Sequence, residues 1–188
     1  MPGPYFTIPN LLTLARLALA PFIAWQIAGG HARTGLYWLF AVGLTDAVDG
    51  YLARRFAWTS PAGAYLDPLA DKVLAASVFL ALGFAHALPW WLVGLVFGRD
   101  LLILLAAGFL FLFSGYRRFS PSVWGKLSTF CQLTTAGFAI GNRAFPVLGV
   151  GWVVETLIWV AAAATLWSGL DYLRRAVESG PRPIRNGP

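Results

Sequence analysis

Residues 46–72, which read DAVDGYLARRFAWTSPAGAYLDPLADK, hold four of the eight acidic residues of this 188-residue chain. Apolar sequence long enough to cross a bilayer lies on both sides of this stretch. A carboxylate near the hydrocarbon region of a membrane is costly, so four of them in two neighbouring apolar segments indicate a functional site. The remainder of the chain is interpreted as the scaffold that holds this stretch in place.

Composition places the chain in a membrane. It is 58% hydrophobic and 12% charged, whereas a soluble domain carries about 25% charged residues. The net charge of +6 is compatible with nucleic-acid binding, but the basic residues lie between apolar segments and form no basic face. We therefore expect no nucleic-acid partner. The single cysteine, Cys131, excludes an internal disulfide.

The apolar segments predict an all-α integral membrane protein with six transmembrane helices and a single catalytic domain over residues 1–188. The predicted helices cover residues 10–28, 34–56, 63–85, 90–113, 122–140 and 149–173, with Asn10 as a helix cap. Gly94 and Gly98 form a GxxxG pattern that predicts close helix packing. Residues 180–188 are rich in proline and glycine and are expected to be a disordered tail.

The distribution of arginines predicts the orientation. Six spans put both termini on one side, together with Arg54, Arg55, Arg117, Arg118 and the tail arginines. The opposite loops hold only Arg33 and Arg143. The positive-inside rule then places the termini and the 46–71 turn in the cytoplasm. We expect a multi-pass protein of a bacterial-type inner (plasma) membrane with its site facing the cytoplasm.

The carboxylates form two pairs. Asp46 and Asp49 are three residues apart, and Asp67 and Asp71 are four apart, so each pair lies on one face of its helix. The short turn between them predicts antiparallel neighbouring helices with the pairs facing each other. Four carboxylates without a counter-charge would repel, and divalent cations remove this repulsion; all-oxygen ligands suit Mg²⁺, Mn²⁺ or Ca²⁺ better than zinc.

Small residues and one cation surround the carboxylates. Gly50, Ala53 and Gly63 allow backbone and ligand to approach, and Arg54 supplies a positive charge. Carboxylates for metal, small residues for access and an arginine for phosphate together indicate a site for a pyrophosphate-like group.

The same residues fit the motif D-x2-D-G-x2-A-R-x8-G-x3-D-x3-D at every fixed position, from Asp46 to Asp71. The chain therefore resembles the CDP-alcohol phosphatidyltransferases. The resemblance implies six transmembrane helices, a homodimer, and a site for two divalent cations, Mg²⁺ or Mn²⁺. It also implies transfer of a phosphatidyl group from CDP-diacylglycerol to an alcohol or phospholipid acceptor, with release of CMP. The expected partners are these two substrates and the surrounding membrane lipids.

The resemblance also implies roles for individual residues. Asp46, Asp49, Asp67 and Asp71 would be metal ligands, and Asp71 would also be the general base for the acceptor hydroxyl. The residues around the CDP group would be Asp46, Asp49, Gly50, Ala53, Arg54, Ser60, Gly63 and Asp67.

The acceptor is less well defined. The basic residues that could meet an acceptor phosphate are Arg16, Arg99, Arg117, Arg118 and Lys126. Arg99 could instead form a buried ion pair with the adjacent Asp100, and Arg117 and Arg118 could be topology signals only.

The opening TIPNLLTLAR, residues 7–16, and LDPLADK, residues 66–72, resemble the branch that makes phosphatidylglycerophosphate and cardiolipin. Two features lean toward the eukaryotic-type cardiolipin synthases. The glycerophosphate enzymes more often carry Arg-Glu where this chain has Arg99-Asp100, and a second lysine at the position of Ser128. A missing lysine suits a phosphodiester acceptor, because a phosphodiester carries less negative charge than a phosphomonoester. Phosphatidylglycerol is therefore narrowly favoured over glycerol 3-phosphate.

An alternative of another class is a membrane cation pathway that uses the carboxylates. It gives no reason for the small residues and Arg54 at their positions.

Overall fold

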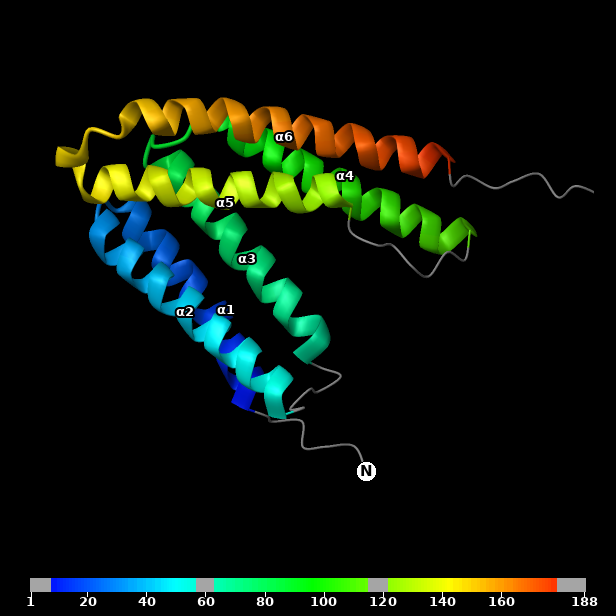
Figure 1. The fold of residues 1–188 in the computed structure, drawn as a ribbon, viewed down its shortest axis with the longest axis horizontal. Coiled ribbons are helices and arrows are strands. Elements are labelled where there is room, and N and C mark those ends of the chain that lie inside the picture. Colours follow the sequence, from blue (N-terminus) through cyan, green and yellow to red (C-terminus); the bar gives the residue numbers. More distant parts are fainter. Residues whose placement is uncertain (1–7, 57–62, 115–121, 179–188) are drawn as a thin grey trace, which may run out of the picture. The chain divides into compact units, whose positions relative to one another are not determined.

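The structure is a computed structural model, and it describes residues 8–56, 63–114 and 122–178 (Figure 1). Within these ranges the chain forms six α-helices and one short 3-10 helix. The elements are α1 (Ile8–Ala28), α2 (Ala32–Phe56), α3 (Gly63–Phe84), α4 (Trp90–Ser114), α5 (Val123–Ala144), η1 (Pro146–Leu148) and α6 (Gly151–Glu178). The predicted all-α class and the number of helices are confirmed. The predicted tail, residues 180–188, lies outside the described residues.

Some helix ends differ from the prediction. Asn10 was predicted to cap the first helix, but α1 begins at Ile8 and Asn10 lies in its first turn. Pro9 is tolerated there because the missing N–H would have no partner within the helix. The turn after η1 is made by Gly149, whose φ of +58° is left-handed and whose N–H bonds to the carbonyl of Pro146.

The described chain divides into two compact units. One comprises residues 1–89 and 136–151, and the other comprises residues 90–135 and 152–188. Helices α1 to α3 therefore belong to the first unit, and α4 and α6 to the second. Helix α5 contributes its first part, up to Thr135, to the second unit and the remainder to the first.

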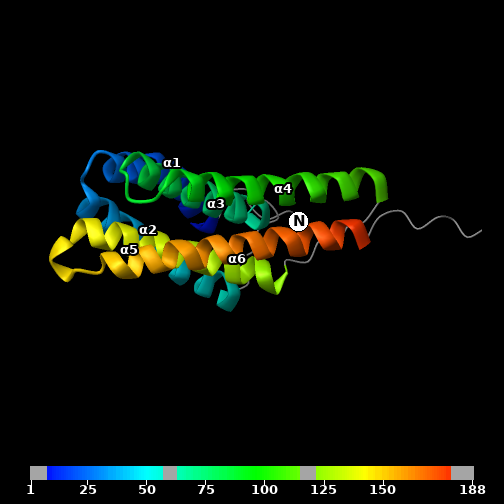
Figure 2. The same cartoon turned by 90° about the horizontal axis from the view of Figure 1, so that it is seen from above.

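In the first unit, α1 packs against both α2 and α3 (Figures 1 and 2). Ala20, Ile23 and Ile27 of α1 are fully buried. The start of α2 comes very close to α1: a Cβ atom added to Gly35 would lie 2.6 Å from Cγ1 of Ile27. Both helices that carry the aspartate motif are thus anchored to α1.

The two arginines predicted for the loops opposite the site bind carbonyls within the first unit. Arg33 donates from Nε to the carbonyl of Ala144 at 2.7 Å, and its guanidinium lies 5.3 Å from the centre of the Phe145 ring. Arg143, in the last turn of α5, donates to the carbonyl of Ala85. These contacts join loops that are distant in sequence.

In the second unit, buried polar side chains join α5 to α6. Gln132 donates from Nε2 to Oγ1 of Thr165 at 2.9 Å and to Oγ of Ser128 at 3.1 Å. Thr135 donates to the carbonyl of Leu157 at 3.2 Å. Such hydrogen bonds between helices stabilise packing where the surroundings are apolar on both sides.

The described residues contain one helix long and apolar enough to cross a membrane, residues 151–175, with a mean hydropathy of 1.5. Leu12–Ala28 is a shorter apolar stretch. The six predicted spans are therefore not confirmed. Charged residues interrupt the other helices, as with Asp46 in α2 and Asp71 and Lys72 in α3.

Candidate active site

Three of the four motif carboxylates meet two polar side chains of α1. Asp46 projects from α2, and Asp67 and Asp71 project from α3. Thr13 and Arg16 are three residues apart on α1 and so lie on one face of that helix. The hydroxyl of Thr13 donates to Oδ1 of Asp67 at 2.5 Å.

Arg16 bridges the two carboxylate-bearing helices. Its Nη1 donates to Oδ1 of Asp71 at 2.7 Å, and its Nη2 donates to Oδ1 of Asp46. The Arg16 side chain is only 6% exposed, whereas those of Asp46 and Asp71 are 49% and 59% exposed. The guanidinium therefore supports the carboxylates from the protein interior, and their other sides remain accessible.

Arg16 is a counter-charge that the sequence analysis did not place here. From the sequence, divalent cations were expected to relieve the repulsion among the carboxylates. In the structure one guanidinium already pairs with Asp46 and Asp71. It also links the two aspartate pairs through α1. Asp67 accepts instead from Thr13, whose hydroxyl carries no charge.

The chemistry of these side chains fits a magnesium or manganese site. Carboxylate oxygens are the ligands that both ions prefer. Among the described side chains, no three histidine, cysteine or acidic groups lie close enough to enclose one ion. The side chain of the fourth motif residue, Asp49, is outside the described set. The residues that would hold cations are Asp46, Asp67 and Asp71, completed by Asp49.

The residues predicted around the CDP group lie in the last turns of α2, at the start of α3 and in the segment between them. Asp49, Gly50, Ala53 and Arg54 fall in the last turns of α2, and Gly63 is the first residue of α3. The structure describes the backbone of these five residues. Ser60 lies between the two helices, outside the described residues. The helical positions of the motif therefore agree with the prediction.

Arg99, a predicted acceptor ligand, is bound within the second unit. Its Nη1 donates to Oδ1 of Asp100 at 2.7 Å, and its Nη2 donates to Oγ of Ser168 at 2.8 Å. The guanidinium also lies 5.7 Å from the centre of the Tyr172 ring. Arg99 is buried, so the structure has the ion pair that the sequence analysis left open as the alternative.

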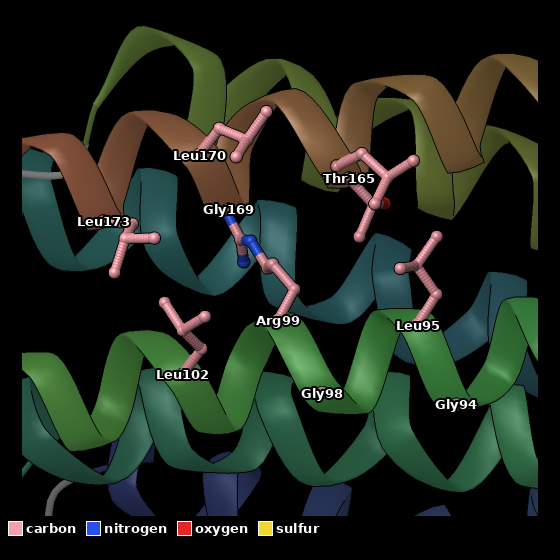
Figure 3. A pocket seen from close by; sticks show the side chains of 10 residues that line it. Gly94, Leu95, Gly98, Arg99, Leu102, Thr165, Gly169, Leu170 and Leu173 are labelled. Carbon is pink, nitrogen blue, oxygen red and sulfur yellow. The ribbon is translucent and has the colours of Figure 1, made fainter.

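An apolar pocket of about 330 Å³ lies next to Arg99, between α4 and α6 (Figure 3). Figure 3 shows Arg99 extending from α4 toward Gly169 of α6. Gly94 and Gly98 line this pocket. No other described side chain or helix lies within 4 Å of a Cβ added to either glycine. The prediction that these glycines pack closely against a helix is therefore wrong within the described structure, because they form a wall of the pocket instead.

The remaining predicted acceptor residues differ in how far the structure describes them. Lys126 lies exposed in the first turn of α5, and its backbone N–H bonds to the carbonyl of Ser122 at 3.1 Å. Arg117 and Arg118 lie outside the described residues. Ser128, at the position where a lysine was considered, is fully buried, and its Oγ lies 3.3 Å from Oγ1 of Thr165.

Thr13 was not predicted from the sequence as a site residue. Arg16 was predicted, but as a residue that could bind the acceptor phosphate. A signal was present in the sequence. Both are polar, lie three residues apart, and occur in an otherwise apolar helix. A shared helical face of this kind predicts a common partner, although the partner itself cannot be named from α1 alone.

Comparisons with known proteins agree with the motif. Residues 6–167 match the family described as CDP-alcohol phosphatidyltransferase. A fruit-fly (Drosophila melanogaster) protein named "Probable cardiolipin synthase (CMP-forming)" is 38% identical over 181 residues, with 84% of this chain and 55% of that protein covered. The chain thus spans about half the length of that relative.

Two bacterial relatives are covered over most of their length. A Mycobacterium tuberculosis (strain H37Rv) protein named "Probable phosphatidylglycerophosphate synthase" is 36% identical, with 90% of this chain and 81% of that protein covered. A Shigella flexneri serotype 5b protein named "CDP-diacylglycerol--glycerol-3-phosphate 3-phosphatidyltransferase" is 33% identical, with coverage of 91% and 95%. The names of these three relatives therefore differ: one is named for cardiolipin, one for phosphatidylglycerophosphate, and one for transfer to glycerol 3-phosphate.

Proposed function

Because the chain belongs to the CDP-alcohol phosphatidyltransferase family, we propose that it transfers a phosphatidyl group from CDP-diacylglycerol to an alcohol acceptor in phospholipid biosynthesis. The observation that carries this proposal is the bridging of Asp46 and Asp71 by the buried Arg16, with Asp67 bound by Thr13 on the same face of α1. In the reaction, the acceptor oxygen forms a bond to the phosphorus next to diacylglycerol. The bond from that phosphorus to the bridging oxygen breaks, and CMP leaves with the electron pair.

The motif residues take the following roles in this proposal. Asp46, Asp49, Asp67 and Asp71 hold two divalent cations, Mg²⁺ or Mn²⁺, which when bound neutralise the pyrophosphate and the leaving CMP. Asp71 also accepts the proton of the acceptor hydroxyl. Its half-exposed side chain supports this role, because a base must be reachable by the substrate.

We place the CDP group at the end of α2 and the start of α3. Gly50, Ala53 and Gly63 would leave room for the ligand close to the backbone, Arg54 would supply a positive charge for the phosphates, and Ser60 would be among the residues around the CDP group. These residues are close in sequence to Asp46 and Asp67, which supports a binding region shared by nucleotide and metal.

Phosphatidylglycerol is narrowly favoured as the acceptor, and glycerol 3-phosphate is the alternative. The aspartate after Arg99 and the serine at position 128 support the first choice. Ser128 carries no charge that could meet a phosphomonoester, and its side chain is buried against Thr165 of α6. The proposed ligands of the acceptor phosphate are Lys126, Arg117 and Arg118. Arg99, which is paired with Asp100, contributes positive charge to acceptor binding.

We place the enzyme in a bacterial-type plasma membrane, with six spans, a cytoplasmic site and both units in one catalytic domain that forms a homodimer. Exposed apolar side chains support the membrane. Large ones occur on every α-helix, including Trp25, Phe40, Phe84, Leu104, Phe130 and Trp152. Only 28% of the apolar segment of α6 is buried, unlike the core helix of a soluble protein.

The cation pathway is the less favoured function. The pathway gives no role to the Arg16 guanidinium that pairs with Asp46 and Asp71. The pathway also leaves Gly50, Ala53 and Arg54 without a role.

The test is a mass-spectrometric assay on purified protein in detergent with CDP-diacylglycerol and Mg²⁺ or Mn²⁺. Phosphatidylglycerol and glycerol 3-phosphate are offered in parallel reactions, with Asp71→Asn as the control for background transfer. Cardiolipin and CMP are the expected products. Phosphatidylglycerophosphate and CMP would keep the reaction and change the acceptor, and failure to bind CDP-diacylglycerol would overturn the proposal.

A further inference from the structure

One face of α1 contacts all three described carboxylates of the motif, and each contact is made to a single oxygen. Thr13 binds Oδ1 of Asp67, and Arg16 binds Oδ1 of Asp71 and Oδ1 of Asp46. In all three carboxylates the oxygen bound by α1 is Oδ1, and the second oxygen, Oδ2, takes no part in these contacts. Each carboxylate therefore has one oxygen held by α1 and one directed elsewhere.

Burial separates the two sides of this arrangement. Thr13 is 1% exposed and Arg16 is 6% exposed, while the carboxylates they bind at positions 46 and 71 are about half exposed. A buried guanidinium is costly unless its donors are paired. Arg16 satisfies this requirement through two carboxylates on two different helices, and a planar guanidinium fork is suited to bridge them.

We propose that Thr13 and Arg16 are positioning residues of the metal site. They hold Oδ1 of Asp67, Asp71 and Asp46, and so direct the second oxygen of each carboxylate toward the divalent cations. This inference rests on the proposed function, in which these aspartates are the metal ligands. Hydrogen bonds to ligating carboxylates orient the ligands, and their loss typically lowers metal affinity or activity about 10–100-fold.

The same contacts change the expected role of Arg16. The sequence analysis grouped it with residues that could meet the acceptor phosphate. In the structure both terminal nitrogens are bonded to aspartates and the side chain is buried. Its contribution to the acceptor is therefore indirect, through the geometry of Asp71.

Charge-conserving substitutions separate positioning from simple electrostatic effects. Thr13→Val replaces the hydroxyl by a methyl group of similar size, and Thr13→Ser retains the hydroxyl. Arg16→Lys keeps the positive charge but loses the planar fork that reaches two carboxylates. Thr156→Val is the matched control, because the hydroxyl of Thr156 is exposed and donates only within its own helix, to the carbonyl of Trp152 at 2.9 Å.

The readout is Mn²⁺ binding to the purified full-length protein in detergent, without substrate, measured from the free-ion signal in electron paramagnetic resonance. We expect Thr13→Val and Arg16→Lys to weaken Mn²⁺ binding by about 10-fold or more. Thr13→Ser and Thr156→Val should bind like the wild type. Helical circular dichroism and gel filtration establish that each variant is folded, and if Arg16→Lys does not fold, Thr13→Val decides the question.

The outcomes distinguish this inference from the proposed function. Wild-type affinity in both Thr13→Val and Arg16→Lys overturns the positioning role and leaves the metal site intact. Tighter Mn²⁺ binding in Arg16→Lys also overturns it, because Arg16 would then compete with the cation. Absence of Mn²⁺ binding in the wild type removes the metal site of the proposed function, and the positioning role with it.

Discussion

Replacing Arg16 by methionine should destabilise the metal-free protein by about 3 kcal/mol. Methionine keeps an apolar stem of similar length and removes the guanidinium. The two carboxylates paired with it, Asp46 and Asp71, then lose their described cation. Repulsion among them and the loss of two bonds between helices both act against the folded state.

The magnitude follows from the two bonds and their exposure. A hydrogen bond to a charged group contributes about 1.5–3 kcal/mol, so two contribute about 3–6 kcal/mol. Asp46 and Asp71 are 49% and 59% exposed, and water can partly solvate them when Arg16 is removed. The lower end, about 3 kcal/mol, is therefore the better value. It corresponds to a decrease in Tm of about 6–12 °C for a chain of this size.

The assay is thermal unfolding in detergent with EDTA, followed by circular dichroism. Thr156→Val is the control, because the exposed hydroxyl of Thr156 donates to a carbonyl of its own helix and its removal should change stability by no more than about 0.5 kcal/mol. Saturating Mg²⁺ should recover part of the loss in Arg16→Met by supplying positive charge at the same carboxylates. An unchanged Tm in EDTA would refute the argument that Arg16 holds α2 and α3 to α1.

Three further predictions concern the reaction and the second unit. Asp71→Asn should abolish CMP release while CDP-diacylglycerol binding, measured at equilibrium, largely survives; substantial turnover would reject Asp71 as the base. Lys126→Ala should raise the KM for the acceptor more than that for CDP-diacylglycerol, and equal effects in steady-state kinetics would remove its acceptor role. Arg99→Ala should raise the acceptor KM and also cost about 3 kcal/mol of stability, because Asp100 and Ser168 lose a buried partner. A Tm equal to that of the wild type would show that the Arg99–Ser168 hydrogen bond does not hold α4 to α6.

Much of the local structure could be predicted because it depends on neighbouring residues. The six helices follow from the lengths of the apolar segments and from the breaks near Gly29, Pro61 and Pro89. The spacing of Asp46 and Asp49, and of Asp67 and Asp71, already places each pair on one helical face. The motif could therefore be located, and its chemistry interpreted, without coordinates.

Packing predictions were less successful where they depended on which helix face meets which neighbour. The GxxxG pattern of Gly94 and Gly98 shows that one face of the helix carries no side chains at these two positions, but it does not show what lies against that face. In the second unit that face borders a pocket. An ion pair between the adjacent Arg99 and Asp100 could be predicted from the sequence. The further contacts of Arg99 with Ser168 and Tyr172 could not be predicted, because they depend on where α6 lies.

The helical class, the approximate helix lengths and the four-carboxylate motif could be predicted without coordinates, because they depend on composition and on spacings of a few residues. The contacts of the carboxylates became known only from the folded chain. Thr13 and Asp67 are 54 residues apart in the chain, and Arg16 is 30 residues from Asp46 and 55 from Asp71. No local spacing encodes these pairs, since they arise from the rotation of α1 against α2 and α3. That rotation places a threonine and an arginine against three carboxylates.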